Sequence, residues 1–263
     1  MVIFIFAEYT NFFMKKYITH KLKNLYSIIS SLYYQIKIQI FFNIKNNKYL
    51  YDKTKILRKK GYIHLKSVIP KNIIDDFLEQ NEKSILYEKN NLIDNFLINV
   101  NIEPDKAKVF FDYFKKEKIL DICKDYLGKI GILNCIINYQ TDRDCETSSM
   151  QPHHDTRGND LKIYVWLSDY NEKSHPIYYI NGSNNDFKLY ITYNHHRRKD
   201  ISKDKMDIIQ GEKGDIIIFD THGWHSHVKK NTAERIVLEL TVIPKNYFFN
   251  SLEKENTIFN NVI

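Results

Sequence analysis

Glycine, proline and cysteine are scarce in this chain of 263 residues, with 8, 5 and 3 copies. The cysteines at positions 123, 135 and 145 have neither paired nor metal-binding spacing, which argues against a disulfide framework and predicts a reducing compartment. No stretch reaches the roughly 18 uncharged apolar residues that a membrane-spanning helix requires. The apolar start, residues 1–6, is too short for a signal peptide and has no basic segment before it. We therefore expect a cytoplasmic protein.

An excess of positive charge is also missing from most of the chain. The net charge is +7, and residues 1–50 hold seven lysines against one acid, Glu8, so that nearly all the excess lies in this segment. The sequence has no internal repeat or low-complexity linker, and 43% of its residues are hydrophobic. We therefore predict a basic N-terminal arm over residues 1–50 and one globular domain over residues 51–263. Nucleic-acid binding is not expected, because no recognition motif accompanies the charge.

Residues 14–44 predict a helix with one apolar face, because apolar residues recur alternately four and three positions apart from Ile18 to Ile36. Three roles fit such a helix. It packs on the outside of the main domain, it forms a homodimer, or it lies on an anionic membrane surface, which makes the protein peripheral to a membrane. The sequence leaves these roles open, and the first is the commonest for an amphipathic helix.

Helices are predicted before strands along the rest of the chain. Residues 56–60 end a helix and residues 62–65 form a strand after a glycine turn. Pro70 and Pro104 each open a helix, and residues 119–127 form another that a glycine ends. Beyond these, the apolar period changes to that of strands, which are predicted over 130–140, 150–156, 161–168, 176–181, 187–193, 206–210, 215–219, 225–229 and 235–243. This order predicts a mainly β fold with N-terminal helices, a double-stranded β-helix or jelly roll.

The segment Gln151–Thr156 contains a His-x-Asp pair. Because side chains i and i+2 of a strand share a face, His153 and Asp155 are expected to project together, with His154 on the opposite face. An imidazole and a carboxylate are two of the three protein ligands of a facial iron(II) site, which needs one further histidine. Three downstream histidines are candidates for that position: His222, His225 and His227.

The order of motifs around this pair carries a resemblance. The pair is followed by an apolar strand, a Gly-Ser turn, a Gly-Asp turn into a second apolar strand, a histidine, and an arginine ten residues later, in the segments 161–169, 178–183, 214–219, 225 and 235. Over residues 56–243 this set resembles the phytanoyl-CoA dioxygenase family of iron(II)- and 2-oxoglutarate-dependent oxygenases.

The resemblance implies the site. It makes His153, Asp155 and His225 the iron ligands, with His227 in reserve, and Arg235 the partner of the distal carboxylate of 2-oxoglutarate. A guanidinium fork suits a carboxylate better than a lysine does. The remaining histidines are expected to be structural, near the site or exposed: His20, His64, His154, His175, His195, His196 and His222.

The resemblance also implies the reaction. Halogenating relatives lose the carboxylate ligand, so Asp155 implies hydroxylation of a small organic substrate by O2, with 2-oxoglutarate oxidised to succinate. Turns that depart from the family's pattern, such as Gly182-Ser183-Asn184, leave the substrate open. The alternative is a jelly-roll protein that is non-catalytic or binds a metal without 2-oxoglutarate, attached to membranes through residues 14–44.

Overall fold

The computed structural model describes residues 48–90, 97–140, 151–155, 160–169, 176–186, 201–227 and 234–244. The predicted helix over 14–44, the predicted strand over 187–193, and His20, His175, His195 and His196 lie outside these residues. The domain boundary after residue 50 therefore stays a prediction. Among the described residues, no helix is long and apolar enough to cross a membrane.

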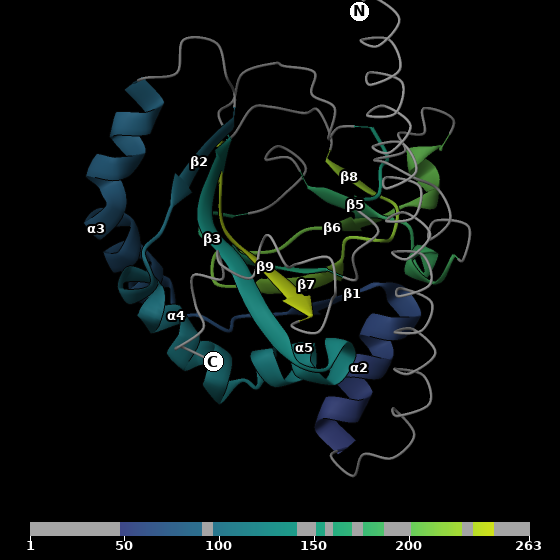
Figure 1. The fold of residues 1–263 in the computed structure, drawn as a ribbon. Helices are drawn as coiled ribbons and strands as arrows, with labels where there is room; N and C mark the ends of the chain where they lie inside the picture. The colour runs from purple at the N-terminus through teal and green to yellow at the C-terminus, as the bar shows by residue number, and fades with distance from the viewer. Residues whose placement is uncertain are drawn as a thin grey trace, which may run out of the picture.

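The described helices precede most of the strands (Figure 1). They are α2 (Lys48–Lys60), α3 (Lys71–Asn90), α4 (Pro104–Lys116) and α5 (Ile119–Leu127). The strands are β1 (Tyr62–Leu65), β2 (Leu97–Asn101), β3 (Ile130–Gln140), β4 (Leu161–Trp166), β5 (Ile177–Tyr179), β6 (Asp207–Ile209), β7 (Ile216–Asp220), β8 (His225–His227) and β9 (Arg235–Pro244). Two short 3-10 helices, η2 (Ser183–Asn185) and η3 (Lys203–Lys205), lie in the connections.

The predicted helix ends are confirmed. α4 begins at Pro104, where the missing N–H leaves no helical hydrogen bond unmade. α5 ends at Gly128, whose φ of 84° is a conformation that glycine adopts without steric cost. The turn into β7 needs Gly214, whose φ is 98° and where a Cβ would collide with the carbonyl oxygen of Ile69.

The strands form two antiparallel sheets, as the jelly-roll prediction requires. The large sheet has the order β1-β7-β4-β9-β3-β2, and the small sheet has the order β6-β5-β8. From β4 onwards the chain passes back and forth between the sheets: β4, β7 and β9 lie in the large sheet, and β5, β6 and β8 lie in the small sheet, as in the winding of a double-stranded β-helix. The predicted mainly β jelly roll with N-terminal helices is thereby confirmed.

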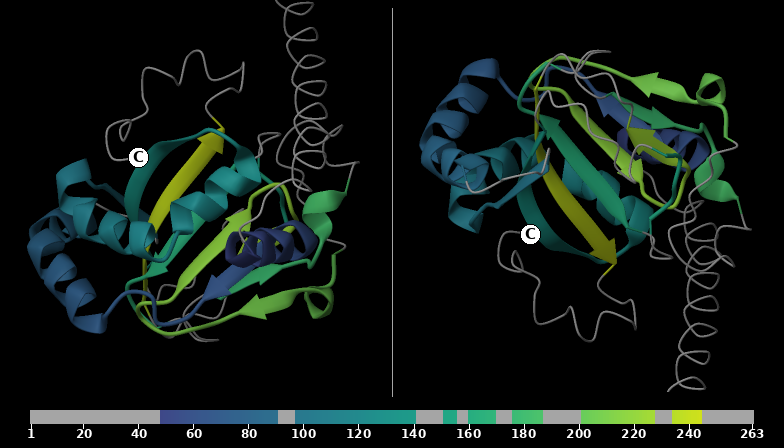
Figure 2. Two further views of the ribbon diagram at one scale, coloured as in Figure 1. Left: turned by 90° about the horizontal axis from the view of Figure 1, so that it is seen from below. Right: turned by 90° about the horizontal axis from the view of Figure 1, so that it is seen from above.

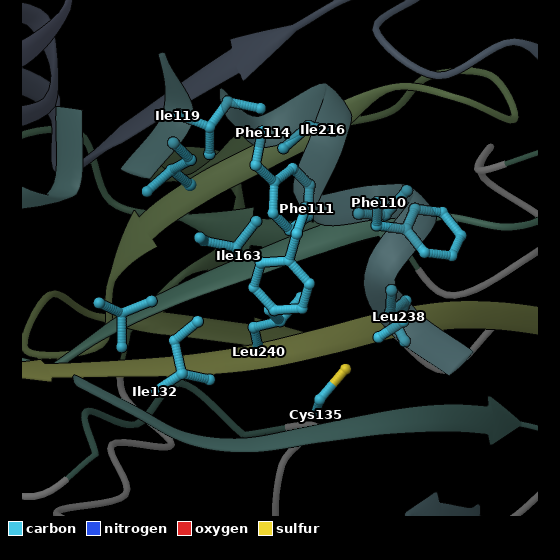
Figure 3. Packing of buried hydrophobic residues seen from close by; sticks show 14 of the residues in the cluster. Phe110, Phe111, Phe114, Ile119, Ile132, Cys135, Ile163, Ile216, Leu238 and Leu240 are labelled. Carbon is cyan, nitrogen blue, oxygen red and sulfur yellow. The ribbon is translucent and has the colours of Figure 1, made fainter. Parts of the chain in front are cut away.

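The helices cover the outer face of the large sheet, the face away from the small sheet (Figure 2). Figure 3 shows phenylalanines of α4 packed over aliphatic side chains of β4, β7 and β9. A second cluster fills the space between the two sheets, and its buried members are Tyr164, Trp166, Ile177, Tyr179, Ile209, Ile217, Phe219 and Val237. This inner face carries the candidate site.

Two strand predictions need correction. β2 was not predicted, although residues 98–101 alternate apolar and polar over this short stretch; pairing with β3 holds this edge strand in place. The strand predicted over 150–156 is wrong for the residues described: His153 forms only an isolated bridge with His225. Pro152 has no N–H to extend that ladder, and the Asp155 N–H instead donates to the Thr221 carbonyl at 2.9 Å.

Candidate metal centre

Three side chains from two distant segments converge on the inner face. One potential ligand atom each of His153, Asp155 and His225 lies within 4.8 Å of the others. Asp155 Oδ1 lies 3.7 Å from His153 Nε2 and 3.8 Å from His225 Nε2. The backbone bridge between His153 and His225, with N–O distances of 2.9 and 2.8 Å, fixes the two histidines side by side. The expected projection of His153 and Asp155 to one side is therefore observed without a full strand.

Each histidine of this cluster is held by its other ring nitrogen. His153 Nδ1 lies 2.8 Å from the Gln151 carbonyl oxygen, and His225 Nδ1 lies 2.8 Å from the Gly223 carbonyl oxygen. A carbonyl only accepts, so both Nδ1 atoms carry the proton and both Nε2 atoms present a lone pair to the cluster. Burial, followed by the neighbouring His153, lowers the pKa of His225 to about 3, which keeps its ring neutral.

His154 points away from this cluster, as predicted. Its ring is buried against His222 and Trp224, at centroid distances of 5.8 and 5.2 Å. Burial, and then His154, lowers the pKa of His222 to about 3. His154 therefore packs against the turn that leads to His225, on the side away from the cluster.

That turn is anchored by a buried carboxylate, Asp220. Its side chain accepts a hydrogen bond from the Tyr126 hydroxyl at 2.6 Å and from the His222 N–H at 2.9 Å. The Tyr179 hydroxyl donates to the Asp220 carbonyl at 2.8 Å. Burial raises the pKa of Asp220 to about 6, against the opposing effect of the Tyr126 and His222 donors. The turn is therefore tied to both sheets and to α5 before His225 begins β8.

Arg235 is fully buried at the start of β9. Its guanidinium Nη1 lies 3.0 Å from His227 Nδ1, and its Nη2 donates to Asn138 Oδ1 at 3.3 Å. His227 therefore faces Arg235, whereas His225 faces the cluster, and this position favours His225 over the reserve candidate. Burial, then the charge of Arg235, lowers the pKa of His227 well below its ordinary value.

Two charged residues of this face, Lys162 and Glu239, were not predicted from the sequence. Lys162 Nζ lies 2.9 Å from Glu239 Oε1 and 3.9 Å from Asp155 Oδ2. Lys162 occupies an inward position of β4, and Glu239 occupies an inward position of β9. A charge that breaks apolar alternation on a buried strand was the available signal. His64, expected to be structural, lies 2.9 Å from the Asp215 carboxylate at the other end of β7.

No family model and no curated protein matches the sequence. Solved structures with similar folds do exist. The epimerase SnoN, in complex with Fe3+, alpha ketoglutarate and nogalamycin RO, has a TM-score of 0.53 and 14% identity, over 74% of this chain and 83% of that chain. HygX from Streptomyces hygroscopicus, with nickel and 2-oxoglutarate bound, has a TM-score of 0.56 and 13% identity, over 74% of this chain and 87% of that chain. The alpha ketoglutarate dependent carbocyclase SnoK from nogalamycin biosynthesis has a TM-score of 0.54 and 13% identity, over 76% of this chain and 84% of that chain.

The chain shares the fold of these enzymes. At this level of identity the likeness establishes the architecture and not the reaction. The specific resemblance to the phytanoyl-CoA dioxygenase family rests on the motifs of the sequence and stays a prediction.

Proposed function

We propose that this protein is a non-haem iron(II)- and 2-oxoglutarate-dependent oxygenase that hydroxylates a small organic molecule. The observation that carries the proposal is the convergence of His153, Asp155 and His225, with both histidine Nε2 atoms turned toward the Asp155 carboxylate. Two neutral imidazoles and one carboxylate form the donor set that suits iron(II) and leaves coordination positions for other molecules. The domain over residues 51–263 is then the catalytic domain.

Arg235 supplies the second part of the proposal. It is buried on the same inner face, and its guanidinium contacts the neutral partners His227 and Asn138. A guanidinium fork matches the two oxygens of a carboxylate. We assign the distal carboxylate of 2-oxoglutarate to Arg235, which binds it while the 2-oxo acid end reaches the metal. The three solved relatives support this assignment, because each is described as bound to or dependent on the same 2-oxo acid.

When bound, iron(II) would supply the oxidising chemistry: one oxygen atom of O2 enters succinate as 2-oxoglutarate loses carbon dioxide, and the other is inserted into a substrate C–H bond. The protein's own residues bind and orient the reactants and exclude water. Hydroxylation is the outcome proposed, because Asp155 keeps the carboxylate ligand. SnoN and SnoK are described as an epimerase and a carbocyclase, so the product must be identified directly.

The first test is spectroscopic. Anaerobic addition of 2-oxoglutarate to the iron(II)-loaded protein is expected to produce a visible charge-transfer band. Asp155→Ala should abolish this band and lower iron(II) affinity at least about 100-fold, since it removes a charged ligand. The matched control is Asp121→Ala, which removes an exposed carboxylate on α5 that pairs only loosely with Lys124, at 3.8 Å.

The second test is the reaction itself. Exposure to O2 should yield succinate, and a substrate found by screening should gain one oxygen atom. Iron(II) binding without a band would favour a metal protein that does not use 2-oxoglutarate. No metal binding at all would favour a non-catalytic jelly roll, and either result would refute the proposal.

A further inference from the structure

Lys162 lies on the inner face of β4, in line with Tyr164 and Trp166. β4 and β9 pair antiparallel, so that Lys162 is opposite Thr241 and Tyr164 is opposite Glu239. Lys162 and Glu239 are therefore diagonal neighbours on one face, within reach of long side chains. Their ion pair, at 2.9 Å, is largely buried, with 24% of the lysine side chain and 7% of the glutamate side chain exposed.

The two oxygens of the Asp155 carboxylate face different neighbours. Its Oδ1 faces the two histidine Nε2 atoms, at 3.7 and 3.8 Å. Its Oδ2 faces Lys162 Nζ at 3.9 Å. A carboxylate can bind a metal through one oxygen or through both, and an ammonium beside one oxygen favours the first mode.

The glutamate makes this arrangement electrostatically tolerable. A lone ammonium near a divalent ion would repel it, but Glu239 cancels that charge and orients the amine. Lysine is ordinarily a cation at neutral pH, and the Glu239 carboxylate 2.9 Å away is its counter-ion. Lys162 thus has the charge and the position to restrain Asp155.

We propose that Lys162, oriented by Glu239, is a positioning residue that makes Asp155 a metal ligand through Oδ1 alone. The inference rests on the proposed metal site. Its consequence is that Oδ2 does not occupy a coordination position that the 2-oxo acid or O2 needs.

The test is a charge-neutral double variant, Lys162→Met with Glu239→Met. It removes both partners of the buried pair, a change that proteins often tolerate, and leaves the net charge near the metal unaltered. Cobalt(II) alone, followed by calorimetry and by its visible absorption, is the probe. Loss of an outer partner of a ligand typically costs about 10- to 100-fold in metal affinity, and we expect a loss in this range with a shifted cobalt(II) spectrum. The control is Lys71→Met with Glu212→Met, an exposed ion pair of 3.1 Å, which should change neither.

A second comparison separates positioning from general damage. In an Asp155→Ala background, the Lys162/Glu239 double substitution should leave cobalt(II) affinity within about threefold, because the group on which Lys162 acts is absent. Lys162→Arg in the unaltered background should keep most of the affinity. Unchanged affinity in the double variant, or an equal loss with and without Asp155, would overturn the inference alone. Absence of cobalt(II) binding by the unaltered protein would overturn the metal site as well.

Discussion

The two faces of the large sheet are built from alternate residues of the same strands, yet they differ in chemistry: the outer face is apolar, whereas the inner face combines an apolar and aromatic cluster with buried charges. In β4, Leu161, Ile163 and Val165 face the helices, whereas Lys162 and Tyr164 face the small sheet. In β9, apolar residues again face the helices, and Arg235, Glu239 and Thr241 face inward. The outer face is a close-packed apolar layer, and the inner face holds charges close to the candidate metal ligands.

The difference shows where stability and chemistry are located. Burial of apolar area under the helices favours folding, whereas buried charges contribute little net stability and are retained where they serve binding. Substitutions on the outer face should therefore change the free energy of unfolding, and substitutions on the inner face should change ligand affinity.

The largest expected effect is on the outer face. Phe114→Ala removes a fully buried ring of α4 and should lower the free energy of unfolding by about 3–5 kcal/mol. Chemical denaturation measures this loss, and the folded fraction should bind cobalt(II) with unchanged affinity. The reciprocal control is Asp155→Ala, which should lose metal affinity with a change of less than about 1 kcal/mol in stability. Loss of metal affinity in folded Phe114→Ala protein would show that the two faces are coupled.

The next effect tests the inner face away from the metal. Arg235→Met should weaken 2-oxoglutarate binding by about 2–3 kcal/mol, on the order of 100-fold in Kd, because a charge-assisted contact is lost. Metal affinity should not change. Calorimetry with the metal-loaded protein measures both.

The control for this variant is Arg58→Met, which removes another arginine with long-range contacts. Arg58 donates to the Asp125 and Tyr126 carbonyls, each at 3.2 Å, and lies over the Tyr126 ring. It should lose stability and keep 2-oxoglutarate affinity. Equal 2-oxoglutarate affinity in Arg235→Met and the unaltered protein would exclude the role assigned to Arg235.

Much of this arrangement was predictable from local signals. Apolar strand patterns and turn residues predicted β4, β7 and β9, and prolines and a glycine predicted the helix ends, because these signals act within a few residues. The His-x-Asp pair and the downstream histidines identified the residues that converge. The choice between His225 and His227 depends on position in three dimensions, where His227 meets Arg235 instead.

The misses have a common physical cause. Lys162 and Glu239 are far apart in the sequence, and only the β4–β9 register brings them together. β2 has only five residues, too short a pattern to identify a strand without its pairing with β3. The segment around His153 alternates like a strand, but the Asp155 N–H donates to Thr221 of the neighbouring turn. Each of these features depends on a partner that local pattern does not reveal.

A smaller effect is expected where the two faces meet, at the Asp220 turn. Tyr126→Phe removes the hydroxyl that donates to Asp220 at 2.6 Å and should cost about 1.5 kcal/mol at pH 7.5, where this carboxylate is ionised. The loss should shrink below pH 6, because protonated Asp220 needs that donor less. Denaturation at both pH values measures it. A loss independent of pH would mean that packing of the ring, and not the hydrogen bond, stabilises the turn.

The smallest effect is on the pH dependence of the free energy of unfolding, to which buried His222 and Asp220 contribute with opposite sign. The folded pKa of His222 is about 3, below its unfolded value of 6.5, so the unfolded chain binds a proton first as the pH falls. Its contribution is therefore complete above pH 6.5 and is lost progressively as the pH falls toward 3. Asp220, with a raised pKa of about 6, acts in the opposite direction between pH 6 and its unfolded value of 3.8. His222→Phe keeps a ring against His154 and removes only the histidine titration. Between pH 7 and pH 6 the unaltered protein should lose about 0.7 kcal/mol more than this variant, as measured by denaturation. An identical pH dependence in the two proteins would mean that folding does not lower the pKa of His222.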